Sequence, residues 1–142
     1  MSGSSTPQHP RYPWRLETNN RYKDAIKIVM DLSTASLVLP IFFLRDVLSI
    51  PKDQPLIQAL NYRVYCSWIC FTLTLILGFV FYYASAKWIR LAWGQEAGFF
   101  RIATTDKFVE RVLDGSFVGA IVTFVLGLGS ILWFMVTFKP VA

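Results

Sequence analysis

The sequence is poor in the residues that carry most enzyme chemistry. It has one histidine and two cysteines, and 16% of its 142 residues are charged, whereas soluble domains carry about 25%. It contains no serine–histidine–aspartate set, no HExxH, no phosphate-binding glycine loop and no dinucleotide fingerprint. We therefore expect no enzyme, no catalytic residue and no bound cofactor.

The scarce histidine and cysteines also predict no metal site. Cys66 and Cys70 lie one helical turn apart in an apolar run, and His9 lies in a separate serine- and proline-rich segment. A structural zinc site needs about four such ligands held together. The two thiols are better interpreted as small residues of a helix-packing face.

The most prominent feature of the sequence is a pair of long apolar runs that contain no charged residue. Val64 to Ala86 is 23 residues long, and Gly115 to Phe138 is 24. A helix of about 20 apolar residues, rising 1.5 Å per residue, crosses a hydrocarbon core of about 30 Å. The runs predict an all-α integral membrane protein.

A third crossing is expected earlier in the chain. Leu32 to Leu44 is free of charge but short, so a full crossing requires Lys27 and Arg45 to extend to opposite interfaces. The alternative is a re-entrant or interfacial segment. The predicted organisation is a flexible cytoplasmic tail over 1–20 and one transmembrane domain over 21–142. Its three transmembrane helices are expected at about 26–49, 58–93 and 105–138.

The basic residues flank the runs and predict an orientation. Three crossings place ten lysines and arginines on one side and four on the other. The positive-inside rule then puts the N-terminus in the cytoplasm and the C-terminus outside, in a multi-pass protein of the inner (plasma) membrane. We assign the net charge of +5 to contacts with membrane lipids, and expect no nucleic-acid partner.

Small residues form a stripe in the last run. Gly115, Gly119, Thr123 and Gly127 recur every four residues, and Gly78 lies on a small, weakly polar face of the preceding run. Small residues let helices approach closely in lipid. The stripe predicts either packing within one chain or a seam between copies of a homo-oligomer.

Charged rows precede this stripe. Lys107 and Arg111 continue its register, and an acidic line runs beside them. That line consists of Asp106, Glu110 and Asp114. Neighbouring rows of opposite charge suit ion pairs between adjacent chains. The alternative is a solvated helix end with pairs inside the same helix.

Three residues are candidates for a pore or its gate. Asp31 is the only acid close to the hydrocarbon, and it predicts either an interfacial acid in the first helical turn or a charged constriction. Thr74 lies on the weakly polar face, which could pack against another helix or line a narrow water path. Asp114 lies at the cytoplasmic mouth of the last run.

Two segments resemble a known group of proteins. LSTASLVLPIFFLRD (Leu32–Asp46) and SWICFTLTLILG (Ser67–Gly78) resemble segments of small bacterial multi-pass inner-membrane proteins. Some of these are similar to membrane effectors of antiphage abortive-infection systems. The resemblance implies a protein that oligomerises and breaches the membrane. The chain shows no sensor domain, so a sensor would be a separate protein partner.

The sequence therefore predicts a small homo-oligomeric membrane protein. As a function we expect a pore-forming or membrane-perturbing effector, gated from the cytoplasmic side at residues 87–114. The alternative is a non-catalytic subunit that anchors or scaffolds a larger membrane complex.

Overall fold

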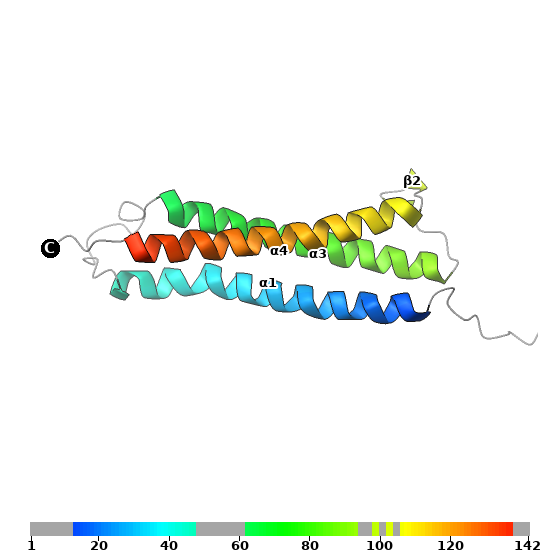
Figure 1. The fold of residues 1–142 in the computed structure, drawn as a ribbon, viewed down its shortest axis with the longest axis horizontal. Coiled ribbons are helices and arrows are strands. Elements are labelled where there is room, and N and C mark those ends of the chain that lie inside the picture. Colours follow the sequence, from blue (N-terminus) through cyan, green and yellow to red (C-terminus); the bar gives the residue numbers. More distant parts are fainter. Residues whose placement is uncertain (1–12, 48–61, 94–97, 100–101, 104–105, 138–142) are drawn as a thin grey trace, which may run out of the picture.

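Three long helices lie side by side in an elongated bundle, as Figure 1 shows for the computed structural model. The structure describes residues 13–47, 62–93, 98–99, 102–103 and 106–137. The helices are α1 (Pro13–Val47), α3 (Tyr62–Ala92) and α4 (Asp106–Thr137). Two short strands, β1 (Gly98–Phe99) and β2 (Ile102–Ala103), pair antiparallel between α3 and α4. In Figure 1, α1 and α4 begin at the same end of the bundle, where α3 ends, and we call this the polar end.

The second and third predicted helices agree with α3 and α4 to within a few residues at each end. Both are long and apolar enough to cross a membrane by length and composition, which confirms the two helices expected from the charge-free runs. With 31 residues, α3 is about 46 Å long. It is therefore longer than a hydrocarbon core of about 30 Å.

The first helix differs from its prediction. A flexible tail was expected up to residue 20 and a helix over 26–49, whereas α1 begins at Pro13; residues 1–12 lie outside the described part. Proline is well tolerated in the first helical turn, and contacts to α3 and α4 order the turns that follow. Within the described ranges, only α3 and α4 have the length and hydropathy of a membrane span. Length and composition therefore do not support α1 as a third one.

The contact between α3 and α4 has a coiled-coil spacing. On α3, buried residues recur at alternating intervals of three and four, and on α4 the same spacing recurs. The α3 positions are Val64, Ser67, Phe71, Thr74, Gly78, Phe81, Ser85, Trp88 and Ala92. The α4 positions are Val109, Leu113, Ser116, Ala120, the half-buried Thr123, and Gly127. An average interval of 3.5 residues keeps a seam facing its partner along two long helices.

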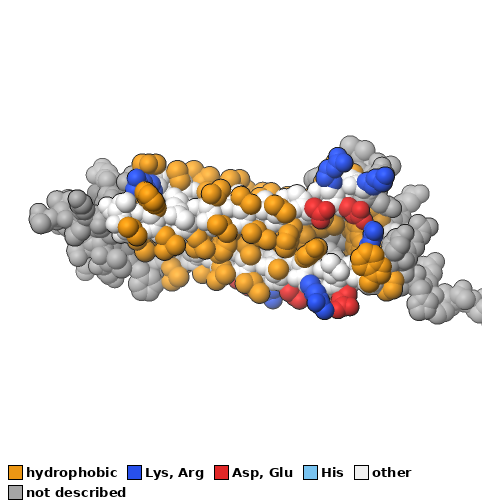
Figure 2. Space-filling model, viewed as in Figure 1, with side chains coloured by type: hydrophobic (Ala, Val, Ile, Leu, Met, Phe, Trp, Pro, Cys, Tyr) orange, Lys and Arg blue, Asp and Glu red, His pale blue; other side chains and the backbone are white. Residues whose placement is uncertain are grey.

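This seam is more polar than the surface around it. Serine, threonine and glycine fill much of its length, while large apolar side chains such as Ile76, Phe79, Val125 and Leu126 are exposed. Figure 2 shows the apolar surface over the middle of the bundle, with most charged side chains gathered toward the polar end. Small residues inside and large apolar residues outside are typical of helices packed in lipid.

Candidate functional site

The small-residue stripe of α4 packs against α3 of the same chain. A Cβ atom at Gly119 would lie 3.1 Å from Leu77, and one at Gly127 would lie 2.8 Å from the Phe71 ring. Gly115 has no neighbouring atom within 4 Å of such a Cβ. Of the two predicted alternatives, the structure therefore shows packing within the chain for Gly119 and Gly127.

Gly78 has a different neighbour. A Cβ atom there would overlap the side chain of Met30, so Gly78 provides the close approach of α1 to α3. The glycine thus belongs to a helix-packing contact, but with the first helix.

Thr74 corrects one of the pore candidates. Its side chain is fully buried, and its hydroxyl lies 2.8 Å from the hydroxyl of Thr123. Each hydroxyl also lies within hydrogen-bond distance of a backbone carbonyl one turn earlier on its own helix. Because each hydroxyl has a single proton, one of the two donates to the other, and the second donates to its own backbone carbonyl. Thr74 joins α3 to α4 and lines no path in this structure.

The charged rows of α4 meet α1. The Glu110 carboxylate accepts a hydrogen bond of 2.8 Å from the Arg15 guanidinium, while Lys107, Arg111 and Asp114 are exposed. The ion pairs expected inside α4 are absent from the described side chains. Asp106 begins α4, and its side chain lies outside the described part. The sequence did not predict Arg15 as the partner of Glu110, because Arg15 lies in the segment that was expected to be a flexible tail.

Two buried polar contacts fix the first half of α1. The Asn19 amide donates to the Ser85 hydroxyl at 2.8 Å, and that hydroxyl donates back to the Asn19 carbonyl oxygen at 3.1 Å. The Tyr82 hydroxyl donates to the backbone carbonyl of Lys23 at 3.1 Å. Buried polar groups need such partners. No sequence signal paired these residues, because they lie about sixty positions apart along the chain.

A charged strip, formed by Asp24, Lys27 and Asp31, runs along the exposed side of α1. These intervals of three and four residues place the side chains on one helical face. The neighbouring residue Met30 lies against Gly78, three residues from the middle of the charge-free run of α3, or about 5 Å along its axis. Asp31 therefore lies beside the apolar middle of the bundle, whereas Lys27 and Asp24 lie roughly 6 and 10 Å nearer the polar end.

An apolar strip directly borders the charged strip, since Ile28 lies one helical turn from Asp24. Ile28, Leu32 and Leu39 are all exposed there. Within the described part, no ion pair joins Lys27 to either carboxylate of the charged strip. The exposed surface of α1 thus carries a charged strip and an apolar strip side by side.

Comparison with known proteins adds no assignment. The chain matches no protein-family model, no curated protein and no solved structure. The resemblance to bacterial membrane effectors stays a prediction. Among the described residues, no three histidine, cysteine or acidic side chains gather as a metal site. Function must therefore be argued from the geometry of this chain.

Proposed function

We propose that this protein forms a homo-oligomeric pore in the inner (plasma) membrane, with α1 as a third crossing that lines the water path. The charged strip of α1 carries the proposal. Asp24, Lys27 and Asp31 are exposed, and Asp31 lies at the depth of the apolar middle of α3. In lipid, such residues almost always face a bundle interior or a water-filled cavity.

The energetic reason is desolvation. Placing one aspartate or lysine at the centre of a lipid-facing helix costs roughly 2.5–3.5 kcal/mol on insertion scales. Several copies that turn their charged strips toward a common axis keep these side chains wet. The apolar strip of Ile28, Leu32 and Leu39 then faces lipid. The two carboxylates exceed the one ammonium in each copy, so the path favours cations.

The contact between copies differs from the one expected from the sequence. Gly119, Thr123 and Gly127 already contact α3 in their own chain, so only Gly115 of the stripe is open. We assign the contact between copies to the flanks of the charged strip on α1.

The orientation follows from the same arrangement. α1 and α4 begin at the polar end, where the larger group of basic residues gathers, so this end faces the cytoplasm. Reporters fused to the two termini test it. Opposite sides are expected if α1 crosses, whereas a C-terminus on the cytoplasmic side would contradict a third crossing.

Gating is assigned to the polar end. The Arg15–Glu110 ion pair connects the first turn of α4 to the helix that carries the charged strip. A signal or a protein partner that moves α4 or the β1–β2 connection therefore acts directly on α1. This contact supports control from the cytoplasmic side.

Ion flux through vesicles tests the pore. Purified full-length protein is reconstituted, and potassium and chloride permeation are compared for the wild type, Asp31→Asn and Glu17→Gln. Both variants remove one carboxylate from α1, but Glu17 pairs with Arg21 at the polar end. We expect cation preference to fall in Asp31→Asn and to persist in Glu17→Gln. Vesicles that stay ion-tight at high protein density would contradict the proposal.

The charged strip also supports a second function. A non-conducting subunit that anchors a larger complex could bury the strip against a helix of another membrane protein, with charges opposed in pairs. Isolation from membranes distinguishes the two. A stoichiometric partner bound to the wild type and lost in Asp31→Asn, together with ion-tight vesicles, favours the anchoring subunit.

A further inference from the structure

A cavity opens between the three helices at the polar end. Its volume is about 230 Å³, and α1, α3 and α4 all contribute to its wall. It is distinct from the charged strip, which lies further along α1. Its lining combines aromatic rings with charged side chains, a pairing that neither the packing seam nor the charged strip shows.

Aromatic rings form much of the cavity wall. The ring centroids of Tyr22 and Phe117 lie 4.8 Å apart, and those of Phe81 and Phe117 lie 5.9 Å apart. Trp88 is largely buried behind them, whereas Tyr22 is 43% exposed. The faces of aromatic rings carry negative electrostatic potential and attract cations.

The charge at the rim is negative overall. Arg15, Glu110 and Asp114 line the cavity, and the Arg15 guanidinium already pairs with Glu110 at 2.8 Å. Asp114 is exposed and makes no ion pair with the described residues. One carboxylate therefore remains to oppose the charge of a ligand.

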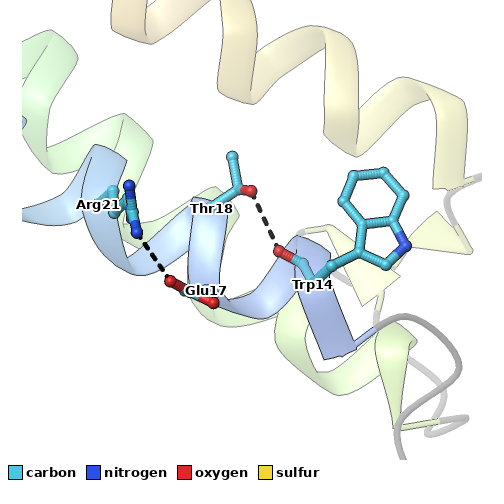
Figure 3. Close-up of polar contacts among 4 residues, drawn as sticks. All are labelled: Trp14, Glu17, Thr18 and Arg21. Carbon is cyan, nitrogen blue, oxygen red and sulfur yellow. Dashed lines mark hydrogen bonds and ion pairs between the residues drawn. The ribbon is translucent and has the colours of Figure 1, made fainter.

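Arg15 shows that a cation is stable in these surroundings. Its guanidinium carbon lies 5.1 Å from the centroid of the Trp14 ring while it pairs with Glu110. Figure 3 shows the Trp14 and Thr18 side chains on the side of α1 that faces α4, with Glu17 on the opposite side. A cation held between an aromatic face and a carboxylate is thus already part of this end of the bundle.

We propose that this cavity binds the ammonium group of a small organic cation. The Asp114 carboxylate opposes the positive charge, and the rings of Tyr22 and Phe117 contact the alkyl groups around the nitrogen. The ligand is either the ammonium headgroup of a lipid or a free amine in the cytoplasm. The site requires no conduction, so it stands independently of the pore.

Calorimetric titration of the full chain with choline tests the site. The protein is held in phosphatidylglycerol nanodiscs, which contain no ammonium lipid, and sodium chloride of equal ionic strength is the blank. We expect saturable binding to the wild type, weakened about tenfold in Asp114→Asn and in Tyr22→Leu. Glu17→Gln and Tyr62→Leu, which change an exposed carboxylate and an exposed ring outside the cavity, should bind choline like the wild type.

A second nanodisc distinguishes the two sources of the ligand. If a lipid headgroup is the natural occupant, binding of added choline disappears in phosphatidylcholine nanodiscs; if a free amine is, binding persists. Circular dichroism and elution volume confirm that each variant is folded. Heats no larger than the sodium chloride blank, or equal affinity in Asp114→Asn, Tyr22→Leu and the wild type, would overturn the site. Neither outcome bears on the pore, which is measured by ion flux.

Discussion

The hydroxyl groups of Thr74 and Thr123 lie 2.8 Å apart in the seam between α3 and α4. Each also lies 2.9 Å from a backbone carbonyl of its own helix, that of Cys70 or Gly119. Since each hydroxyl has one proton, one of the two donates to the other across the seam. This contact joins the two helices that are apolar enough to span a membrane. In lipid, where no hydrophobic effect drives helices together, such polar contacts and close packing hold the pair.

Loss of the threonine contact should weaken the helix pair. We expect Thr74→Val to lower the free energy of unfolding by about 0.6–1.7 kcal/mol, the range measured for hydrogen bonds between membrane helices. Thr72→Val is the matched control, because Thr72 is exposed and bonds only to the carbonyl of Trp68 among the described residues. Unfolding in mixed micelles of rising SDS content, followed by circular dichroism, measures both. Equal losses in the two variants would show that the Thr123 contact contributes nothing.

Two glycines of α4 should respond oppositely to alanine. At Gly127 the new methyl group would lie 2.8 Å from the buried Phe71 ring, while at Gly129 it meets no atom within 4 Å. We expect Gly127→Ala to destabilise the protein by about 1–3 kcal/mol through overpacking. Gly129→Ala should be neutral or stabilising by up to about 1 kcal/mol, because alanine favours the helix.

The same SDS titration measures this pair of variants. If Gly127→Ala were as stable as Gly129→Ala, α4 would not approach α3 as closely as the structure shows. If Gly129→Ala instead dissociated an oligomer, that outer face would be a contact between copies.

The Asn19–Ser85 contact should hold the first half of α1 in place. Asn19→Ala leaves the buried Ser85 hydroxyl without its partner, at a cost of about 1–3 kcal/mol. We expect faster trypsin cleavage after Arg15, Arg21 and Lys23, because these sites become accessible when α1 separates. Asn20→Ala is the control, since Asn20 is the exposed neighbour. Equal cleavage rates in both variants would contradict a fixed α1.

The Arg15–Glu110 ion pair should couple α1 to α4 weakly and in a salt-dependent manner. Its side chains are 39% and 41% exposed, so a double-mutant cycle with Arg15→Gln and Glu110→Gln should give about 0.2–1 kcal/mol. The coupling should fall between 0.05 and 0.5 M salt, at roughly the concentrations where screening shortens below 10 Å. The Arg21–Glu17 pair within α1 provides a control that links no two helices. A coupling independent of salt would point to a packing effect rather than a charge effect.

The helices α3 and α4 could be predicted because one local property, the length of an uncharged apolar run, is enough to indicate them. An uncharged run long enough to cross a bilayer is visible in the sequence, and α3 and α4 follow those runs to within a few residues. A first helix was also predicted, but its start at Pro13 was not, because the first turns of α1 are held by Arg15, Asn19 and Lys23. Their partners lie on the other two helices, and the local composition of α1 does not predict these contacts.

The seam shows why the sequence pattern was only partly informative. Residues four apart on a helix are displaced by about 40° around its axis, so the stripe from Gly115 to Gly127 turns through about 120°. Gly127 therefore contacts Phe71, while Gly115 has left the interface. The observed seam stays directed toward the partner helix because its residues alternate at intervals of three and four. Several of these residues are serines and threonines, so the seam does not appear as an apolar pattern in the sequence.

Composition and the length of the uncharged runs were enough to predict a helical chain with two segments of membrane-spanning length. The length of each run can be compared with the thickness of a bilayer without knowing how the helices pack. The folded arrangement was needed to show that Thr74 is buried, that Gly119 and Gly127 pack within the chain, and that Glu110 pairs with Arg15. It also places Asp31 beside the middle of α3. These relationships depend on the register between helices, and register is decided by side chains that meet only after the chain has folded.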